Sequence, residues 1–121
     1  MSSEMTTVTL PSPAADQAYL DVSALEAGNL RLPIHEFVAD IKPEIVSCPC
    51  LAFLLRHSKT GFQIVFDLGT RRDVDEYPPA THKQVKNSPM VKQTVLESLG
   101  KGGVQPHEVD AVIISHLHWD Q

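Results

Sequence analysis

The sequence has little cysteine, little positive charge and no long apolar run. Cys48 and Cys50 are the only cysteines among 121 residues, and Pro49 separates them. Alternate residues of an extended segment point the same way but are poorly placed for a mutual disulfide. We therefore expect two reduced thiols that enter a buried strand as small apolar side chains. A shared role in metal binding is the alternative.

The charge balance and the lack of apolar runs limit the possible partners. Ten Lys and Arg against 15 Asp and Glu give a net charge of −5, and the basic residues are scattered, which argues against nucleic acid as a partner. No uninterrupted apolar stretch is long enough to cross a bilayer, and the polar residues 1–16 do not resemble a signal peptide. We expect no membrane partner and a cytoplasmic location.

The overall composition is that of a small globular protein. Hydrophobic residues make up 42% of the chain and charged residues 21%, without collagen-like, low-complexity or coiled-coil bias. The length suits one folding unit. We expect a flexible leader over residues 1–17, which are rich in Ser, Thr, Pro and Ala, and one domain over residues 18–121.

Apolar patterns predict two β-hairpins in the first half of the chain. The first covers residues 19–32 with a turn at Gly28-Asn29, and the second joins residues 50–56 to residues 62–66. Residues 34–46 are predicted to form a loop or short irregular turns.

The second half begins with a polar stretch over residues 71–86, which we predict to be a long exposed loop of the kind that often covers a site. Ser88 as cap and Pro89 at the first helical position then predict a helix from Pro89 to Leu99. Residues 106–109 predict a single turn, and the apolar run 111–114 predicts a buried strand. A helix that leads into a buried strand is typical of layered α/β folds.

A His-x-His-x-Asp pattern follows this strand. His116, His118 and Asp120 occupy alternate positions, which places the three side chains on one side of an extended chain. Imidazole nitrogen and carboxylate oxygen suit a borderline ion such as zinc. Because the chain holds six histidines, a chance or merely surface-polar match is the alternative.

The order of these features resembles the metallo-β-lactamase superfamily over about Tyr19 to Asp120. The likeness is carried by Phe66-Asp67-Leu68-Gly69, the helix, Val109-Asp110-Ala111-Val112-Ile113-Ile114-Ser115 and His116-Leu117-His118-Trp119-Asp120. Two further segments, Gly28-Asn29-Leu30-Arg31-Leu32-Pro33 and Tyr77-Pro78-Pro79, are similar to a lactonase-like branch related to acyl-homoserine lactonases.

The resemblance implies an α/β fold, namely the N-terminal half of an αββα sandwich with a mixed sheet, hairpins and one clear helix. It also implies a zinc hydrolase in which one or two metal ions activate a water that attacks an ester, lactone or thioester carbonyl. His116 and His118 match ligands of the first metal. Asp120 matches a ligand of the second metal and is the catalytic candidate. Asp67 matches a residue that supports the metal-binding loop and is not a ligand.

Two departures from the family pattern weaken the expected site. Gln121 stands where the family has a further His, and its amide oxygen is a poorer zinc ligand. The later His, bridging Asp and final His have no counterpart, although catalytic zinc usually takes three protein ligands. We therefore expect a truncated, inactive chain with weak or no zinc binding and possible self-association through an uncovered sheet edge. The alternative is a non-catalytic metal-binding or protein-interaction module.

The other aromatic and imidazole side chains have simpler interpretations. Trp119 is expected to be a core anchor beneath the loop that carries the His-x-His-x-Asp pattern, and a platform for substrate is the alternative. The remaining histidines lie in predicted loops or turns, where solvated polar residues are ordinary: His35, His57, His82 and His107. Of these, His82 is the one whose loop could fold over the site.

Overall fold

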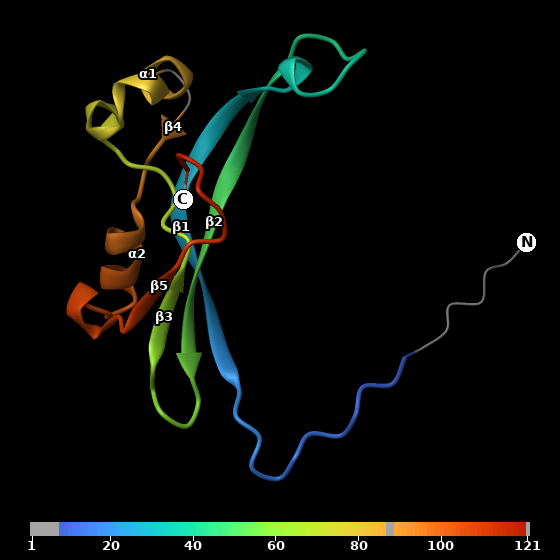
Figure 1. The fold of residues 1–121 in the computed structure, drawn as a ribbon, viewed down its shortest axis with the longest axis vertical. Helices are drawn as coiled ribbons and strands as arrows, with labels where there is room; N and C mark the ends of the chain where they lie inside the picture. The colour runs from blue at the N-terminus through green and yellow to red at the C-terminus, as the bar shows by residue number, and fades with distance from the viewer. Residues whose placement is uncertain (1–7, 87–88, 121) are drawn as a thin grey trace, which may run out of the picture.

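A computed structural model describes residues 8–86 and 89–120 of the chain. In this part of the chain the strands form one mixed sheet in the order β4-β1-β2-β3-β5. The two long strands, β1 (Leu20–Pro33) and β2 (Ile45–His57), form its central antiparallel ribbon (Figure 1). The α/β class predicted from the sequence is confirmed.

The first predicted hairpin is wrong, because β1 runs straight through Gly28-Asn29. The register between β1 and β2 shifts between Glu26 and Asn29, so the extra length is absorbed as a β-bulge and not as a turn. Gly28 has a φ of +94°, and a Cβ there would lie 2.2 Å from the Thr70 hydroxyl oxygen. Glycine therefore allows close packing at the bulge. The chain reverses later, between β1 and β2, where the predicted loop contains one turn, η1 (Ile34–Glu36).

The second predicted hairpin is confirmed. It joins β2 to β3 (Gln63–Phe66), and the turn is closed by hydrogen bonds from the His57 N–H to the Phe62 carbonyl oxygen and from the Gly61 N–H to the His57 carbonyl oxygen. On its other side β3 pairs in parallel with β5 (Ala111–Ile113). The predicted single turn before β5 is also present, as η3 (Pro106–Glu108).

The predicted helix over Pro89–Leu99 begins too early. The structure has a short strand, β4 (Pro89–Met90), and then α2 (Val95–Lys101), while Ser88 lies outside the described residues. Thr94 is the N-cap. Its hydroxyl accepts the Glu97 N–H, and the Glu97 carboxylate accepts the Thr94 N–H. This capping box satisfies backbone donors that the helix itself leaves unpaired, and β4 instead extends the sheet beside β1.

The polar stretch over residues 71–86 is more ordered than the predicted loop. It contains η2 (Val74–Glu76) and α1 (Pro79–Val85), and α1 lies near β4 at one end of the sheet (Figure 1). Pro79 at the first helical turn explains the helix start, since its missing N–H has no partner there anyway.

One face of the sheet is covered by α2 and the segment that follows it. We call it the covered face. Its strand residues and the residues packed on them form the buried core: Leu25, Cys50, Ala52, Leu54 and Val65 from the sheet, with Val95, Leu99 and Val104 against them. The prediction of a buried apolar role is confirmed for Cys50, while Cys48 is half-buried, and both thiols are free.

The opposite face, which we call the open face, is also apolar but is not covered by any described element. The strand register places its side chains together: Leu20, Val22, Leu51, Phe53, Leu55, Ile64, Phe66 and Ile113. Leu51 is 65% exposed and Val22 61%. The predicted strand β5 exists, but Val112 and Ile113 are about half exposed, so its predicted burial is wrong. Because β5 is an edge strand of a sheet with one open face, its side chains remain accessible to solvent. Among the described residues, no helix has the length and apolar character to span a membrane.

Candidate metal centre

The candidate centre begins where two parallel strands end side by side. The chain continues from β3 into Asp67, whose N–H donates to the Ile113 carbonyl oxygen of β5 at 2.9 Å. The buried Asp67 carboxylate accepts the Ser115 N–H at 2.7 Å. Asp67 therefore holds the start of residues 115–120, which carry the His-x-His-x-Asp pattern and which we call the metal segment. The supporting role predicted for Asp67 requires a contact of this kind.

The loop after Asp67 is itself fixed against the bulge of β1. Thr70 donates its N–H to the Ala27 carbonyl oxygen at 3.0 Å. Gly69 has a φ of +68°, and a Cβ there would lie 2.2 Å from the same oxygen. The bulge and the loop thus fit closely together.

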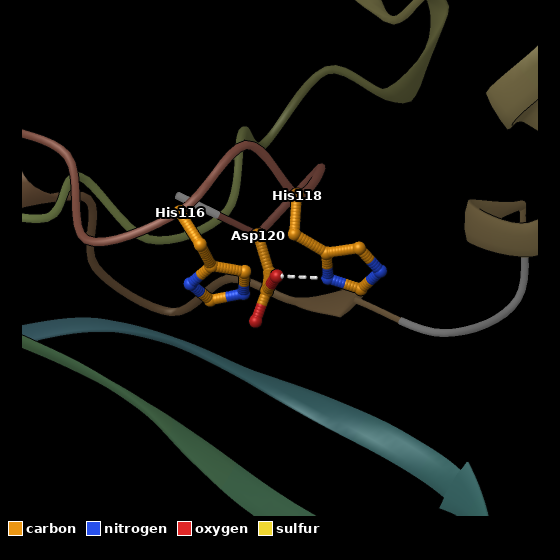
Figure 2. A group of neighbouring side chains, drawn as sticks. All are labelled: His116, His118 and Asp120. Atoms are coloured by element: carbon orange, nitrogen blue, oxygen red, sulfur yellow. Dashed lines mark hydrogen bonds and ion pairs between the residues drawn. The ribbon is translucent and has the colours of Figure 1, made fainter.

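His116, His118 and Asp120 converge in the structure (Figure 2). One donor atom from each lies within 4.8 Å of the others. The two imidazole rings are stacked, with centroids 5.8 Å apart and planes at 15°. Both histidines are exposed and Asp120 is half-buried. Within residues 8–86 and 89–120 this is the one group of three or more His, Cys, Asp or Glu side chains that could share a metal ion. Gln121 lies outside the described residues.

Asp120 makes a direct contact with one of these rings. Its Oδ1 lies 2.6 Å from His118 Nδ1. Two donors on one tetrahedral zinc lie about 3.3 Å apart, because each bond is about 2.0 Å long. The carboxylate is thus a hydrogen-bond acceptor for the His118 Nδ1–H here, and the far nitrogen of that ring, Nε2, points away from His116 and Asp120 (Figure 2). His116 Nδ1 is likewise engaged, 3.0 Å from the Ser115 hydroxyl.

The donor set fits zinc. Two imidazoles and a carboxylate are nitrogen and oxygen ligands of the types that zinc takes in proteins. A carboxylate bound to the far nitrogen of a metal-binding histidine is a common arrangement, since it fixes the tautomer and orients the ring. Asp120 can therefore serve either as a ligand or as the partner of His118.

An aromatic pair lies beside this group. Trp119 packs against the core, which confirms its predicted anchoring role. The Tyr77 ring meets Trp119 edge-on, with centroids 6.0 Å apart, and the Tyr77 hydroxyl accepts the Arg71 N–H at 2.9 Å. Burial raises the pKa of the Tyr77 phenol, and the hydrogen bond from Arg71 partly offsets that rise. Sequence reasoning missed Tyr77 as a contact of the metal segment.

His82 does not belong to the converging group. Its Nε2 lies 2.7 Å from the Tyr77 carbonyl oxygen, and because a carbonyl can only accept, this nitrogen must carry the proton. The stretch 71–86 therefore reaches the metal segment through Tyr77 and not through His82. Cys50 is also outside the group. Burial raises the pKa of the Cys50 thiol to about 11, the negative charge of Asp120 adds to the rise, and a hydrogen bond with Thr70 lowers it.

The other histidines have no part in the group. His57 lies in the hairpin turn, where its Nδ1 accepts the Thr60 N–H at 3.2 Å. His35 and His107 are exposed. A structural or solvated role, as expected for residues in turns, accounts for all three.

No family model matches the sequence. A curated relative is the cytochrome P450 monooxygenase mpaDE' of Penicillium brevicompactum, which is 24% identical over 116 residues. The match covers 84% of this chain but 13% of that protein. The name of the relative therefore describes a much longer chain than the matched part.

Solved structures similar to this chain include two proteins that hold N-acyl homoserines and a probable metal-dependent hydrolase. AiiA of B. thuringiensis, with N-decanoyl-L-homoserine bound at its active site, has a TM-score of 0.63 and 20% identity over 83% of this chain. An N-acyl homoserine lactone hydrolase, with N-hexanoyl-L-homoserine at its catalytic metal centre, has a TM-score of 0.61 and 18% identity over 83%. A probable metal-dependent hydrolase from Staphylococcus aureus has a TM-score of 0.58 and 13% identity over 84%.

This chain spans about two-fifths of the length of those structures, 42%, 42% and 39% respectively. At such identities the likeness establishes the fold. The chain therefore has part of the metallo-β-lactamase fold, as its sequence predicted.

Proposed function

We propose that this chain supplies the first metal-binding segment of a zinc-dependent hydrolase that cleaves an ester, lactone or thioester. The observation that carries the proposal is the convergence of donor atoms from His116, His118 and Asp120 within 4.8 Å, directly after a strand end. The fold is shared with lactone hydrolases, which supports the reaction class.

The residues have distinct roles in this proposal. His116 and His118 each offer an imidazole nitrogen to the metal. Asp120 offers a carboxylate oxygen to the same group, and its Oδ1 accepts the His118 Nδ1–H, which orients the ring. Asp67 holds the first residue of the segment through the Ser115 N–H. When bound, zinc lowers the pKa of a coordinated water and polarises the substrate carbonyl.

The substrate partner is proposed to be a small lactone or ester, because two of the structural neighbours hold N-acyl homoserines, one of them named as the product of a lactone hydrolase. A cytoplasmic location belongs to the same proposal. It is supported by Cys48 and Cys50, which are free thiols lying in β2 without a disulfide.

The exposure of the group favours a second candidate, a metal-binding module without hydrolytic activity. Leu117, between the two histidines, is 99% exposed, and three donors converge among the described residues. Metal-assisted hydrolysis needs a shaped cavity that limits access of bulk water. We therefore propose that these 121 residues by themselves bind zinc weakly and turn over little substrate.

Zinc content separates these possibilities. Protein stripped with a chelator and reloaded with zinc is compared with a His116→Ala, His118→Ala double variant and with His57→Ala, which removes a histidine outside the group. We expect bound zinc in the parent chain and in His57→Ala, and none in the double variant. An N-acyl homoserine lactone and a thioester then test hydrolysis.

Three outcomes are distinct. Zinc-dependent hydrolysis that the double variant abolishes supports the hydrolase. Zinc binding without hydrolysis, in this chain and in any longer chain that contains it, supports the module. Equal zinc content in the parent and the double variant rejects the metal-binding segment and both candidates with it.

A further inference from the structure

We propose that Tyr77 and Trp119 form an aromatic pair that positions His118 for metal binding. The inference deepens the proposed function and rests on it. Tyr77 lies between η2 and α1, far from Trp119 in the sequence, so the pair ties the polar stretch 71–86 to the metal segment.

Tyr77 is a rigid partner. Its side chain is 7% exposed, and its polar atoms are all engaged. The backbone N–H donates to the Val74 carbonyl oxygen at 3.2 Å, the backbone carbonyl oxygen accepts the His82 Nε2–H at 2.7 Å, and the hydroxyl accepts the Arg71 N–H at 2.9 Å. The Arg71 guanidinium also lies over the ring, 5.9 Å from its centroid. A ring held in this way can fix the position of a side chain that packs against it.

Trp119 links the Tyr77 ring to His118 in the metal segment. Its ring lies at 90° to Tyr77 with a centroid distance of 6.0 Å, and at 43° to His118 with a centroid distance of 5.9 Å. The edge-to-face contact of Tyr77 with Trp119 is a geometry that aromatic rings prefer, and the contact of Trp119 with His118 is tilted. Trp119 therefore contacts the fixed ring on one side and a proposed zinc ligand on the other.

The metal segment needs a second anchor of this kind. Its start is held by the bond from Ser115 to Asp67, and it turns tightly where the His118 N–H donates to the His116 carbonyl oxygen at 3.1 Å. Leu117 points into solvent, whereas Trp119 packs against the core. The two histidines thus lie between one polar anchor and one aromatic anchor, and loss of either leaves their relative position less defined.

The test compares Tyr77→Leu, which removes the ring, with Tyr77→Phe, which keeps the ring and removes the hydroxyl. Val104→Ala is the matched control, because it removes buried apolar volume from the covered face, where Val104 lines a pocket with Leu54 and Leu99. Loss of groups that orient a metal ligand typically lowers metal affinity by about 10-fold to 100-fold. We expect a zinc dissociation constant raised by about 10-fold in Tyr77→Leu, and values close to the parent in Tyr77→Phe and Val104→Ala.

A metal-free measurement separates this inference from the proposed function. The ring protons of His118 sense the ring current of Trp119, so their NMR shifts in the zinc-free chain report whether the two rings keep their arrangement. We expect a changed shift in Tyr77→Leu and an unchanged shift in Val104→Ala. The change supports the positioning role even if the parent chain binds no zinc, in which case only the proposed function fails.

Two results overturn the inference. One is a Tyr77→Leu chain with the parent's His118 shifts and, where the parent binds zinc, the parent's affinity. The other is the same displacement of the His118 shifts in Val104→Ala, which would make the effect one of general stability. If Tyr77→Leu does not fold, Trp119→Leu removes the other half of the pair and is read by the same two measurements.

Discussion

The two faces of the sheet are built from similar residues but have opposite environments. On the covered face Leu54 is 8% exposed and packs in the core beneath α2, whereas Leu51, three residues earlier on β2, is 65% exposed on the open face. Both faces are apolar along the same strands. The comparison teaches that an apolar run indicates a surface suited to burial, while the presence of another layer decides whether it is buried.

The largest expected difference between the faces is in stability. Leu54→Ala should lower the free energy of unfolding by about 2–5 kcal/mol, because it leaves a cavity in a packed core. Leu51→Ala should change it by less than about 0.5 kcal/mol, since the side chain already contacts water. Urea denaturation of the two variants measures both. Equal losses would mean that the open face is covered in solution.

A second prediction concerns the helix that makes the covered face different. Thr94→Ala removes the hydroxyl that caps α2 and should lower the free energy of unfolding by about 1 kcal/mol. Thermal unfolding followed by circular dichroism gives the loss. Thr94→Ser keeps the cap and should restore most of the stability. A Thr94→Ala chain as stable as the parent would mean that α2 is held by packing alone.

The open face should be recognisable by its affinity for apolar molecules. Val22→Lys places a charge within the apolar patch and should lower the fluorescence of a hydrophobic dye and the concentration-dependent light scattering. It should change the free energy of unfolding by less than about 0.5 kcal/mol. Asp21→Lys, one residue earlier on β1, places the same charge on the opposite side of the strand. Equal dye signals from the two variants would argue against an accessible apolar face.

The smallest expected effect is the pH dependence of the ion pair that ties α2 to the stretch 71–86. The Arg72 guanidinium donates to the Glu97 carboxylate at 2.6 Å and lowers the pKa of Glu97 from 4.5 to about 2. Because the folded pKa is lowered, the contribution to stability is present above about pH 4.5 and is lost as pH falls towards about 2. The pair is exposed, so the contribution should be small and weakened by salt.

Urea denaturation across this pH range, with and without added salt, measures that contribution. Glu97→Gln should remove the pH dependence that belongs to the pair, and Glu44→Gln is a control on an exposed glutamate outside α2. A parent chain and a Glu97→Gln chain with identical pH profiles would show that the ion pair leaves the attachment of α2 unaffected.

Sequence patterns predicted the secondary structure correctly where a few neighbouring residues determine it. The hairpin between residues 50–56 and 62–66, the single turn at 106–109 and the strand at 111–113 were predicted correctly. Gly28-Asn29 was misread as a turn, because a bulge in a long strand accommodates the same residue types. The helix start was placed at Pro89 although the capping box at Thr94 was visible in the sequence.

The sequence predicted only part of the candidate centre, and the structure shows contacts that the sequence did not predict. The alternation of His116, His118 and Asp120 predicted a shared site, and these residues do converge. Their spacing did not indicate that Asp120 lies at hydrogen-bonding distance from His118. Nor did it indicate that Tyr77 contacts Trp119, because no local periodicity links residues so far apart in the chain.

By itself the sequence determined the strand-forming segments, the apolar character of both faces and the donor chemistry after β5, because these depend on residue type and on short spacings. Only the tertiary structure decided which face α2 covers, how exposed β5 is, and which remote ring lies against Trp119. Those outcomes depend on how the strands order themselves in the sheet and on where the connecting segments pack, and contacts between distant residues exist only once that arrangement has formed.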